Sequence, residues 1–294
     1  MELWQLKQMQ SLPMEVKVMK TKARIREFYN HYDGQVYVAF SGGKDSTVLL
    51  DIARSEYPDM KACFINTGLE YPEIVEFVKT IDNVDVVRPK KSFKQVIDQY
   101  GYPVISKAIS KKIYYAKQGR ESALKFFRNE TKGSRFHCGR YAYMIDAPFK
   151  IHNQCCDELK KKPIHKYEKA TGLVPYIGTM ASDSSMREQR YLETGCNNYG
   201  NNQSIPMAFW MENDIWEYIK AHDLPYSKIY ETGVKRTGCM FCMFGVHLED
   251  YPNRFQRMKK THPKLWKYCI EDLGCGEVMD YIGVDYGTEL RLCD

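Results

Sequence analysis

The sequence has no continuous apolar run of about 18 residues, the shortest stretch that crosses a bilayer as a helix. Its first residues, Met1 to Gln8, lack the basic and then apolar layout of a signal peptide. The apolar share of 44% and the charged share of 27% are ordinary for a globular protein that buries a core. These features predict a cytoplasmic protein with no membrane partner.

Internal repeats and low-complexity linkers are also absent, which argues against a solenoid or a string of loosely joined modules. Instead, short apolar segments alternate with amphipathic segments of about ten residues, the pattern of a parallel sheet with crossover helices. This alternation predicts an α/β fold with a Rossmann-like, open and mainly parallel sheet. The predicted strands are 35–40, 61–65, 82–87 and 173–178, and the predicted helices are 45–54, 72–80, 92–100, 182–193 and 212–222.

A polar stretch joins the first predicted strand to its helix, where residues 41–46 read Ser-Gly-Gly-Lys-Asp-Ser. The spacing is neither that of a P-loop nor that of the Gly-x-Gly-x-x-Gly dinucleotide fingerprint. Glycines let the backbone approach a ligand closely, and the free N–H groups at a helix start attract anions. The stretch therefore predicts a phosphate site, and the alternative is a plain strand–turn–helix corner.

The predicted organisation is one large domain with additions. Residues 102–170 are polar, basic and rich in tyrosine, and strand-like segments are rare after residue 233. We expect an N-terminal helical segment over 1–30, a nucleotide-binding α/β domain over 31–232 with a basic helical insertion at about 102–170, and a cysteine-containing helical region over 233–294.

Positive charge is concentrated in one part of the chain. Residues 107–140 hold ten Lys or Arg and two Glu, and a further run of lysines covers 160–162. Such a segment is either a solvated helical face or a surface for phosphates of a nucleotide or nucleic acid. Both interpretations stay open at the level of sequence.

The ten cysteines point to a metal or redox role rather than a disulfide scaffold, because no secretory signal is present. Cys239 and Cys242 are spaced to place two thiolates on one turn, as zinc and iron–sulfur sites do. Cys155 and Cys156 are adjacent in sequence. The alternatives are structural zinc and ordinary buried free thiols.

The loop at 41–46 resembles the pyrophosphate loop of adenine-nucleotide α-hydrolases, which bind ATP or a related adenylate and react at its α-phosphate. Residues 66–73, Asn-Thr-Gly-Leu-Glu-Tyr-Pro-Glu, are similar to a strand end of the phosphoadenylyl-sulfate (PAPS) reductase branch, with Asn66 in place of the usual acid. Segments at 176–187, 205–219 and 224–242 resemble further motifs of this family in the same order. The resemblance thus extends from residue 41 to residue 242.

The pair Cys155-Cys156, with Pro163 downstream, is similar to a segment of assimilatory adenylyl-sulfate reductases. There the pair joins a later Cys-x-x-Cys around a 4Fe–4S cluster, so the resemblance implies such a cluster here, with the lysines at 160–162 offsetting its charge or meeting the phosphates of the substrate. The implied ligands are Cys155, Cys156, Cys239 and Cys242, with Cys196 as a competing ligand.

The resemblance also implies the nucleotide site, which would take ATP or adenylyl sulfate with Mg²⁺. Lys44, Asp45 and Ser46 would be catalytic, with Asp45 orienting Mg²⁺ or the loop itself. The implied nucleotide-binding residues are Ser41, Gly42, Gly43, Lys44, Asp45, Ser46, Thr67, Gly68, Gly178 and Arg187.

Three functions fit this set of features. The first is an ATP pyrophosphatase that adenylates a target and lets sulfur replace the activated oxygen, as in related DNA-phosphorothioation and tRNA-thiolating enzymes. It would use a DNA or tRNA acceptor and a cysteine-desulfurase-type sulfur donor, and an oligomer is compatible with it. The second is a reductase that releases sulfite from an adenylyl sulfate through a thiolate nucleophile. The third is a non-catalytic subunit that binds a nucleotide or nucleic acid.

Two departures from the family favour the first function over the second. Met180 stands where the family has the arginine of a Gly-x-Arg loop, although Arg187 or Arg190 could compensate. Cys275 has a following glycine but lacks the preceding Glu and the later His of the reductase nucleophile motif, and Cys293 lies at the end of the chain.

Overall fold

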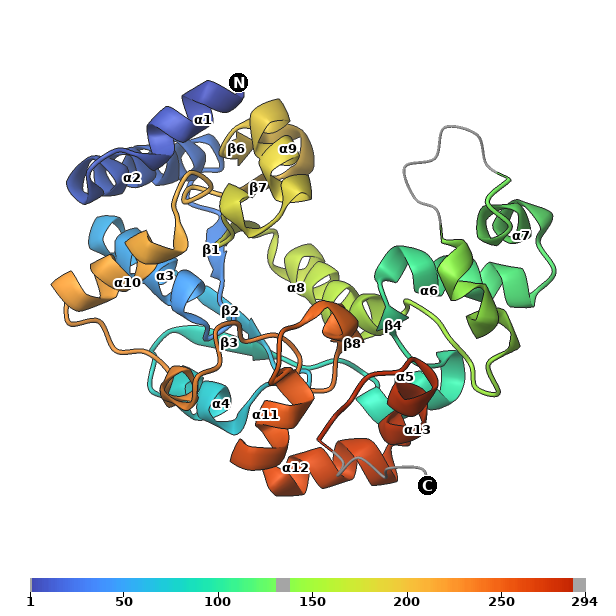
Figure 1. The fold of residues 1–294 in the computed structure, drawn as a ribbon. Helices are drawn as coiled ribbons and strands as arrows, with labels where there is room; N and C mark the ends of the chain where they lie inside the picture. The colour runs from blue at the N-terminus through green and yellow to red at the C-terminus, as the bar shows by residue number, and fades with distance from the viewer. Residues whose placement is uncertain (1, 131–137, 288–294) are drawn as a thin grey trace. The chain divides into compact units, whose positions relative to one another are not determined.

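The computed structural model describes residues 2–130 and 138–287 of the chain (Figure 1). Within these ranges, no helix is both long and apolar enough to cross a membrane. The chain forms two compact units, each assembled from separate stretches of sequence. Unit 1 comprises residues 1–66, 71–88 and 163–236, and unit 2 comprises residues 67–70, 89–162 and 237–294. The three domains predicted from the sequence are continuous stretches of the chain, unlike these two units, and that division stays a prediction.

Unit 1 contains a six-stranded sheet in the order β3-β2-β1-β5-β7-β6. Strands β1, β2, β3, β5 and β7 run parallel to one another, with Val38 opposite both Ala62 and Tyr176. Only β6 among the six strands is antiparallel, and it pairs with β7. The sheet is open, mainly parallel and Rossmann-like, which confirms the predicted fold class. The strands are β1 (Val36–Ala39), β2 (Ala62–Ile65), β3 (Val84–Val87), β5 (Val174–Ile177), β6 (Asn197–Asn198) and β7 (Gln203–Ser204).

The first strand shows why the sheet forms. Consecutive residues Val36, Tyr37 and Val38 are all buried, as expected of a parallel strand that helices cover on both faces. In unit 1, α2 and α10 both pack against α3 (Figure 1). The helical elements are α1 (Leu3–Gln10), α2 (Met14–His31), α3 (Lys44–Glu56), α4 (Pro72–Lys79), α8 (Lys162–Thr171), η3 (Ala181–Asp183), α9 (Ser185–Thr194), η4 (Tyr199–Asn201), α10 (Glu212–Ala221) and η5 (Lys228–Thr232).

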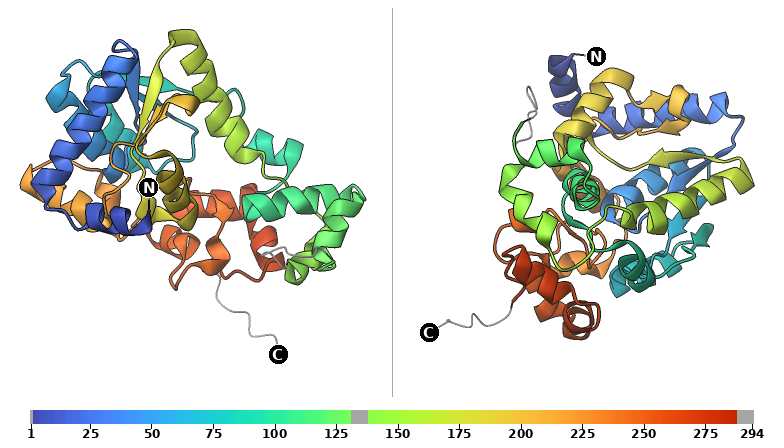
Figure 2. Two further views of the ribbon diagram at one scale, coloured as in Figure 1. Left: turned by 90° about the horizontal axis from the view of Figure 1, so that it is seen from above. Right: turned by 90° about the vertical axis from the view of Figure 1, so that its right-hand side faces the viewer.

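Unit 2 is mainly helical, and α11, α12, η7 and α13 pack together within it (Figure 2). Its sheet has two strands, because β4 pairs in parallel with β8. Strand β8 was not predicted from the sequence, because two residues cannot display an alternating pattern. The elements are α5 (Phe93–Tyr100), β4 (Val104–Ile105), α6 (Lys107–Lys117), α7 (Glu121–Phe127), η1 (Gly139–Asp146), η2 (Asp157–Lys161), β8 (Met243–Phe244), η6 (Val246–Leu248), α11 (Arg254–Thr261), α12 (Pro263–Lys267), η7 (Tyr268–Asp272) and α13 (Cys275–Tyr281).

Candidate functional site

The glycine loop of unit 1 turns sharply between β1 and α3. Gly42 has a φ of +70°, which only glycine adopts without strain. A Cβ at this position would lie 2.8 Å from a methyl of Val78 and 2.9 Å from a methyl of Ile74, both on α4. The loop thus needs glycine here both for its backbone conformation and for its close packing on α4.

Hydrogen bonds between the loop and the first turn of α3 hold its shape. The Ser41 N–H donates to Ser46 Oγ at 3.1 Å, and the Ser46 hydroxyl donates to the Gly43 carbonyl at 2.9 Å. Thr47 donates to the same carbonyl at 3.0 Å. The Lys44 N–H, at the start of the helix, donates to Tyr230 Oη at 2.8 Å. The predicted phosphate-binding residues 41–46 therefore form one ordered turn at a helix N-terminus.

A buried lysine and two carboxylates lie at this turn. Lys44 is 4% exposed, and its Nζ lies 3.2 Å from Asp45 Oδ1 and 3.4 Å from Glu212 Oε1. Burial alone would lower the pKa of Lys44, but Asp45, Tyr230 and Glu212 outweigh it, so the pKa is raised and the amine stays charged. Lys44 can therefore stabilise negative charge on a bound phosphate.

The charged form of Asp45 is disfavoured by its surroundings. Burial raises its pKa, and Asp183 and Glu212 raise it further while Lys44 opposes them. Its Oδ1 is buried and, among the described residues, accepts no hydrogen bond of acceptable geometry, although Lys44 Nζ is within ion-pair distance. A buried carboxylate oxygen of this kind suits a divalent cation, and Mg²⁺ is commonly held by one or two carboxylates together with substrate phosphates.

Two further predicted residues lie beside the turn. A Cβ at Gly178, just after β5, would be 3.1 Å from both the Asp45 carbonyl oxygen and Ser46 Cα, so the end of β5 packs directly on the start of α3. Arg187 on α9 forms an ion pair with Asp183, whose Oδ2 also accepts from the Met180 N–H at 3.0 Å. Gly178 and Arg187 therefore lie at the carboxyl end of the parallel strands, the end that carries the glycine loop.

Thr67 and Gly68 follow β2 and belong to unit 2. The Thr67 hydroxyl and N–H both donate to the Glu70 carboxylate, at 2.8 and 2.9 Å, and Gly68 has a φ of +78°. The Met240 N–H, between the two cysteines of the Cys-x-x-Cys, donates to the Leu69 carbonyl at 2.8 Å. The turn at 67–70 thus rests on the cysteine segment.

The four predicted ligand cysteines gather in unit 2. Cys155 and Cys156 begin a helix that continues through η2, a π-helical turn of the kind often found at functional sites. Burial raises the pKa of Cys155, and the nearby Cys156, Cys239 and Cys242 raise it further. Burial likewise raises the pKa of Cys239 to about 11. Thiols that bind a metal centre must lose their protons, so metal binding here would have to overcome these raised pKa values.

The type of centre follows from the donor set. Among the described residues, no three Cys, His, Asp or Glu side chains are placed to hold a single metal ion. An iron–sulfur cluster differs because each thiolate binds a different iron and the sulfurs stay farther apart. Four converging soft donors fit such a cluster, whereas the identity of the ligands stays a prediction.

Lys160 supplies positive charge to this group of cysteines. Its amine donates to the Cys239 sulfur, and although burial opposes its charge, Cys239, Glu70 and Cys156 raise its pKa. Lys161 pairs with Asp157 at 2.7 Å instead, and Lys162 pairs with Glu158 at 2.5 Å. All three lysines were predicted from the sequence to offset the charge of the cysteines. Glu70 was not predicted, because only tertiary contacts bring it close to Lys160.

Two other cysteines have separate surroundings. Cys196 belongs to unit 1, where it is buried against Tyr191 and Arg24, and its role as a competing ligand stays a prediction. Cys275 is fully buried at the start of α13 and forms a hydrogen bond with Cys269. Cys293 lies outside the described residues.

The basic face of unit 2 consists of exposed side chains on α6, on α7 and near them. Tyr115 lies between two cations, with Arg120 4.2 Å and Lys111 6.0 Å from its ring centroid. Residues 131–137, which include two of the predicted basic positions, lie outside the described part of the chain. The exposed members are Lys107, Lys111, Lys117, Arg120, Lys125, Arg128 and Arg140.

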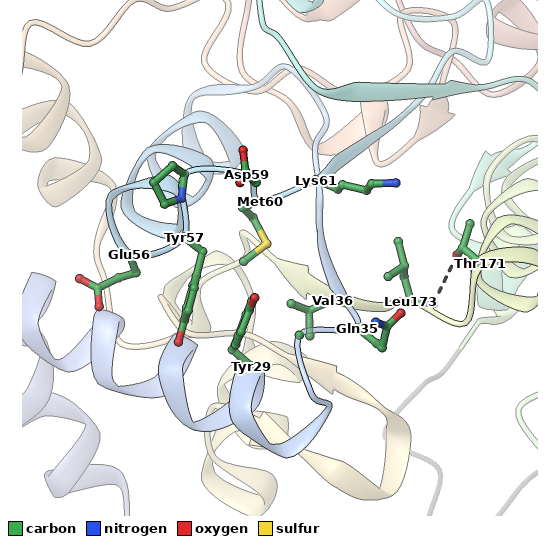
Figure 3. A pocket seen from close by; sticks show the side chains of 12 residues that line it. Tyr29, Gln35, Val36, Glu56, Tyr57, Asp59, Met60, Lys61, Thr171 and Leu173 are labelled. Carbon is green, nitrogen blue, oxygen red and sulfur yellow. Dashed lines mark hydrogen bonds between the residues drawn. The ribbon is translucent and has the colours of Figure 1, made fainter.

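A cavity of about 620 Å³ in unit 1 lies at the other end of the strands (Figure 3). Its lining includes Gln35 before β1, Lys61 before β2 and Leu173 before β5. Tyr29 and Tyr57 stack at its side with ring centroids 3.6 Å apart. Because open α/β sheets bind ligands beyond the carboxyl ends of their strands, this amino-end cavity is not the candidate site.

The sequence matches the family model of the phosphoadenosine phosphosulfate reductase domain over residues 35–112 and 112–244, more than half of the chain. The chain belongs to this family. It is 26% identical over 263 residues to an uncharacterized protein of Methanocaldococcus jannaschii, a match that covers 86% of this chain and 52% of that protein. The chain thus spans about half the length of that relative.

Two further members of the comparison have assigned activities. The PAPS reductase family chain is 24% identical over 216 residues to the adenosine 5'-phosphosulfate reductase of Staphylococcus epidermidis, covering 73% of this chain and 72% of the reductase. A solved structure of U34-tRNA thiolase from Methanococcus maripaludis, with its 4Fe–4S cluster, is 14% identical with a TM-score of 0.39, covering 95% of this chain and 84% of the thiolase. A TM-score this low leaves the family assignment to the sequence match.

Proposed function

We propose that this PAPS reductase family chain is an ATP pyrophosphatase that activates an acceptor by adenylation for sulfur transfer. The observation that carries the proposal is the gathering of Cys155, Cys156, Cys239 and Cys242 with Lys160, in a chain whose other unit presents a phosphate loop. A phosphate loop alone supports any nucleotide enzyme, and the thiols direct the proposal toward sulfur.

In the first step, an acceptor oxygen bonds to the α-phosphorus of ATP while the bond to the β-phosphate breaks, and pyrophosphate leaves. Lys44 and the N–H groups at the start of α3 would stabilise the charge that develops on the phosphates. Asp45 would hold Mg²⁺ through its buried Oδ1. Ser46 and Ser41 keep the loop in the required shape through their shared hydrogen bonds.

In the second step, sulfur at the oxidation level of sulfide bonds to the activated acceptor atom, the bond from that atom to the adenylated oxygen breaks, and AMP leaves with that oxygen. Cys155, Cys156, Cys239 and Cys242 would hold a 4Fe–4S cluster through one thiolate on each iron, and the sulfide would come from the sulfur donor. Lys160 would compensate the negative charge of the thiolates. No net electron transfer is needed when the donor provides sulfide.

We propose a nucleic acid as the acceptor. The basic face is exposed in unit 2, the unit that carries the cysteines. Lys and Arg contacts to phosphates supply sequence-independent affinity for nucleic acids, and a half-buried aromatic ring such as Tyr115 can stack on a base through its open face. A DNA and a tRNA both fit this surface.

A second candidate is an adenylyl-sulfate reductase, which the similarity to the Staphylococcus epidermidis reductase favours. Such an enzyme needs a thiolate nucleophile that reaches the substrate. Cys275 is fully buried, with its thiol bonded to Cys269, so it is poorly suited to this role. For this reason the ATP pyrophosphatase is the first proposal.

The test is pyrophosphate release from ATP and Mg²⁺ by anaerobically prepared protein, with tRNA or DNA and sulfide present. Lys44→Gln should reduce release by at least roughly 100-fold, as loss of one preorganised charge contact does, whereas Lys79→Gln on the exposed end of α4 should not. Sulfite release from adenylyl sulfate, without pyrophosphate release from ATP, would establish the reductase instead. Release of neither product would contradict both enzymatic proposals.

A further inference from the structure

Two cysteines of unit 2 lie outside the group proposed to hold the cluster. Cys269 and Cys275 are both fully buried, and their thiols form a hydrogen bond with each other. The predicted cluster ligands act on one another instead, since the pKa of Cys155 is raised by its fellow ligands. The pair is therefore a second thiol centre, to which the proposed function gives no role.

The backbones beside the two thiols are in contact. Ile270 directly follows Cys269, and Gly276 directly follows Cys275. A Cβ at Gly276 would lie 2.8 Å from a methyl of Ile270 and 3.2 Å from its carbonyl oxygen, so a side chain there would push η7 and α13 apart. Disulfides need Cα atoms about 4.4–6.8 Å apart. Glycine at 276 permits the close approach of the two segments that such a bond requires.

The turn between the two cysteines is held in place. Cys269 lies in η7, a π-helical turn of the kind often found at functional sites. The Leu273 N–H donates to the Tyr268 carbonyl at 3.0 Å, and the Leu273 carbonyl accepts from Tyr102 Oη at 2.8 Å. Gly274, with a φ of +66°, then leads the chain into α13. Because the fold already fixes this turn, a bond between the two sulfurs would order few further residues.

The two thiols have different roles in the hydrogen bond. Burial raises the pKa of Cys269, and the hydrogen bond and charge of Cys275 raise it further. Cys269 therefore keeps its proton and donates it to the Cys275 sulfur. Because the thiolate is the nucleophilic form of cysteine, Cys275 is the sulfur suited to attack an oxidant, and Cys269 is suited to complete the disulfide.

We propose that Cys269 and Cys275 form a reversible disulfide in response to a peroxide. Full burial limits the oxidant to one nearly as small as water, and hydrogen peroxide meets this limit. The Cys275 thiolate attacks a peroxide oxygen, the O–O bond breaks, and the departing hydroxide is protonated to water, which leaves a sulfenic acid on Cys275. The Cys269 sulfur then bonds to the Cys275 sulfur, and the displaced oxygen leaves with the Cys269 proton as a second water.

The reaction is balanced, because the two electrons that the thiols lose reduce the peroxide to water. A dithiol reductant reverses it by thiol–disulfide exchange and is itself oxidised to a disulfide. This modification site goes beyond the proposed function and does not depend on it.

The test is mass spectrometry of the anaerobically prepared protein after exposure to hydrogen peroxide and alkylation of the remaining thiols in denaturant. No Lys or Arg separates Cys269 from Cys275, so trypsin leaves both on one peptide. This peptide should lose two hydrogen atoms and take up no label, and treatment with dithiothreitol should restore both labels. The matched control is Cys63 in β2, a buried thiol whose charged neighbours are carboxylates, which should keep its label.

Variants separate the two steps. In Cys269→Ser, the reaction should stop at the sulfenic acid of Cys275, which a cyclic 1,3-diketone traps with a defined gain in mass. In Cys275→Ser, Cys269 should keep its label. A wild-type peptide that keeps both labels, a disulfide from either cysteine to another part of the chain, or an equal loss of label at Cys63 would overturn the proposal. Pyrophosphate release from ATP by the reduced protein tests the proposed function separately.

Discussion

Lys160 shows how one side chain differs from two chemically identical neighbours. Lys161 and Lys162 each pair with a carboxylate of η2, and only Lys160 among the three donates to a cysteine. Lys160 is placed to act as a counter-ion, because buried thiolates need a positively charged partner. The residue is therefore more important to the cysteine group than its place in a run of lysines suggests.

We expect Lys160→Gln to lower the iron content of anaerobically purified protein, because the bound thiolates would lose their partner. The absorbance that iron–sulfur proteins show near roughly 400 nm should fall in proportion. Lys161→Gln is the matched control, because that lysine pairs with Asp157 and not with a cysteine. Equal iron content in the two variants would contradict the assignment of Lys160.

Asp45 has a cost to stability that depends on pH. Burial raises its pKa in the folded state above that of a free carboxyl group. Both states hold the proton below the unfolded pKa of about 3.9, so the cost is absent there, and it is complete above the folded pKa. Asp45→Asn should therefore raise Tm at pH 7 and leave it unchanged at about pH 3.5, whereas Asp59→Asn at an exposed site should leave Tm unchanged at both pH values. Thermal melts at the two pH values provide the measurement, and a lower Tm for Asp45→Asn at pH 7 would contradict this account.

At the scale of the element, the turn between β1 and α3 depends on Gly42. Gly42→Ala places a methyl group within 3 Å of Val78 and Ile74 in addition to straining a positive φ. We expect a loss of roughly 2–5 kcal/mol in the free energy of unfolding, the sum of backbone strain and overpacking, together with lost ATP binding. Gly172→Ala has the same sign of φ and open space around the new Cβ, so it should lose only the strain part. Chemical denaturation of both variants measures the difference, and equal losses would refute the steric argument.

The sequence predicted the elements whose residues carry a local pattern. The strands at 36–39, 62–65, 84–87 and 174–177 and the loop at 41–46 follow the predicted segments closely, because apolar runs and glycine pairs act locally. The hairpin of β6 and β7 escaped prediction, since each strand has two residues and Asn197, Asn198 and Gln203 are polar. Glu70 escaped for another reason, because its importance arises only when the turn at 67–70 meets Lys160 and Cys239.

For the whole molecule, the net charge of +6 understates the local charge of the basic face. Lys111 on α6 is exposed, and its amine lies 6.0 Å from the centroid of the Tyr115 ring. If this face binds phosphates, Lys111→Gln should weaken binding of any nucleic acid and lower the slope of log affinity against log salt by about 1. Lys264→Gln on α12 should leave the slope unchanged. Binding titrations at several salt concentrations measure both, and equal slopes for the two variants would contradict the assignment.

The Met240 N–H donates a hydrogen bond to the Leu69 carbonyl, so the Met240 amide can be used to detect movement of the turn at 67–70. Amides exchange with deuterated solvent only when their hydrogen bonds open, so the exchange rate at Met240 measures how often the turn leaves the cysteine segment. A nucleotide that tightens the turn would slow this exchange, and iron removal that loosens the cysteine segment would speed it. Hydrogen exchange at this one amide would thus respond both to nucleotide binding at the turn and to iron removal at the cysteines.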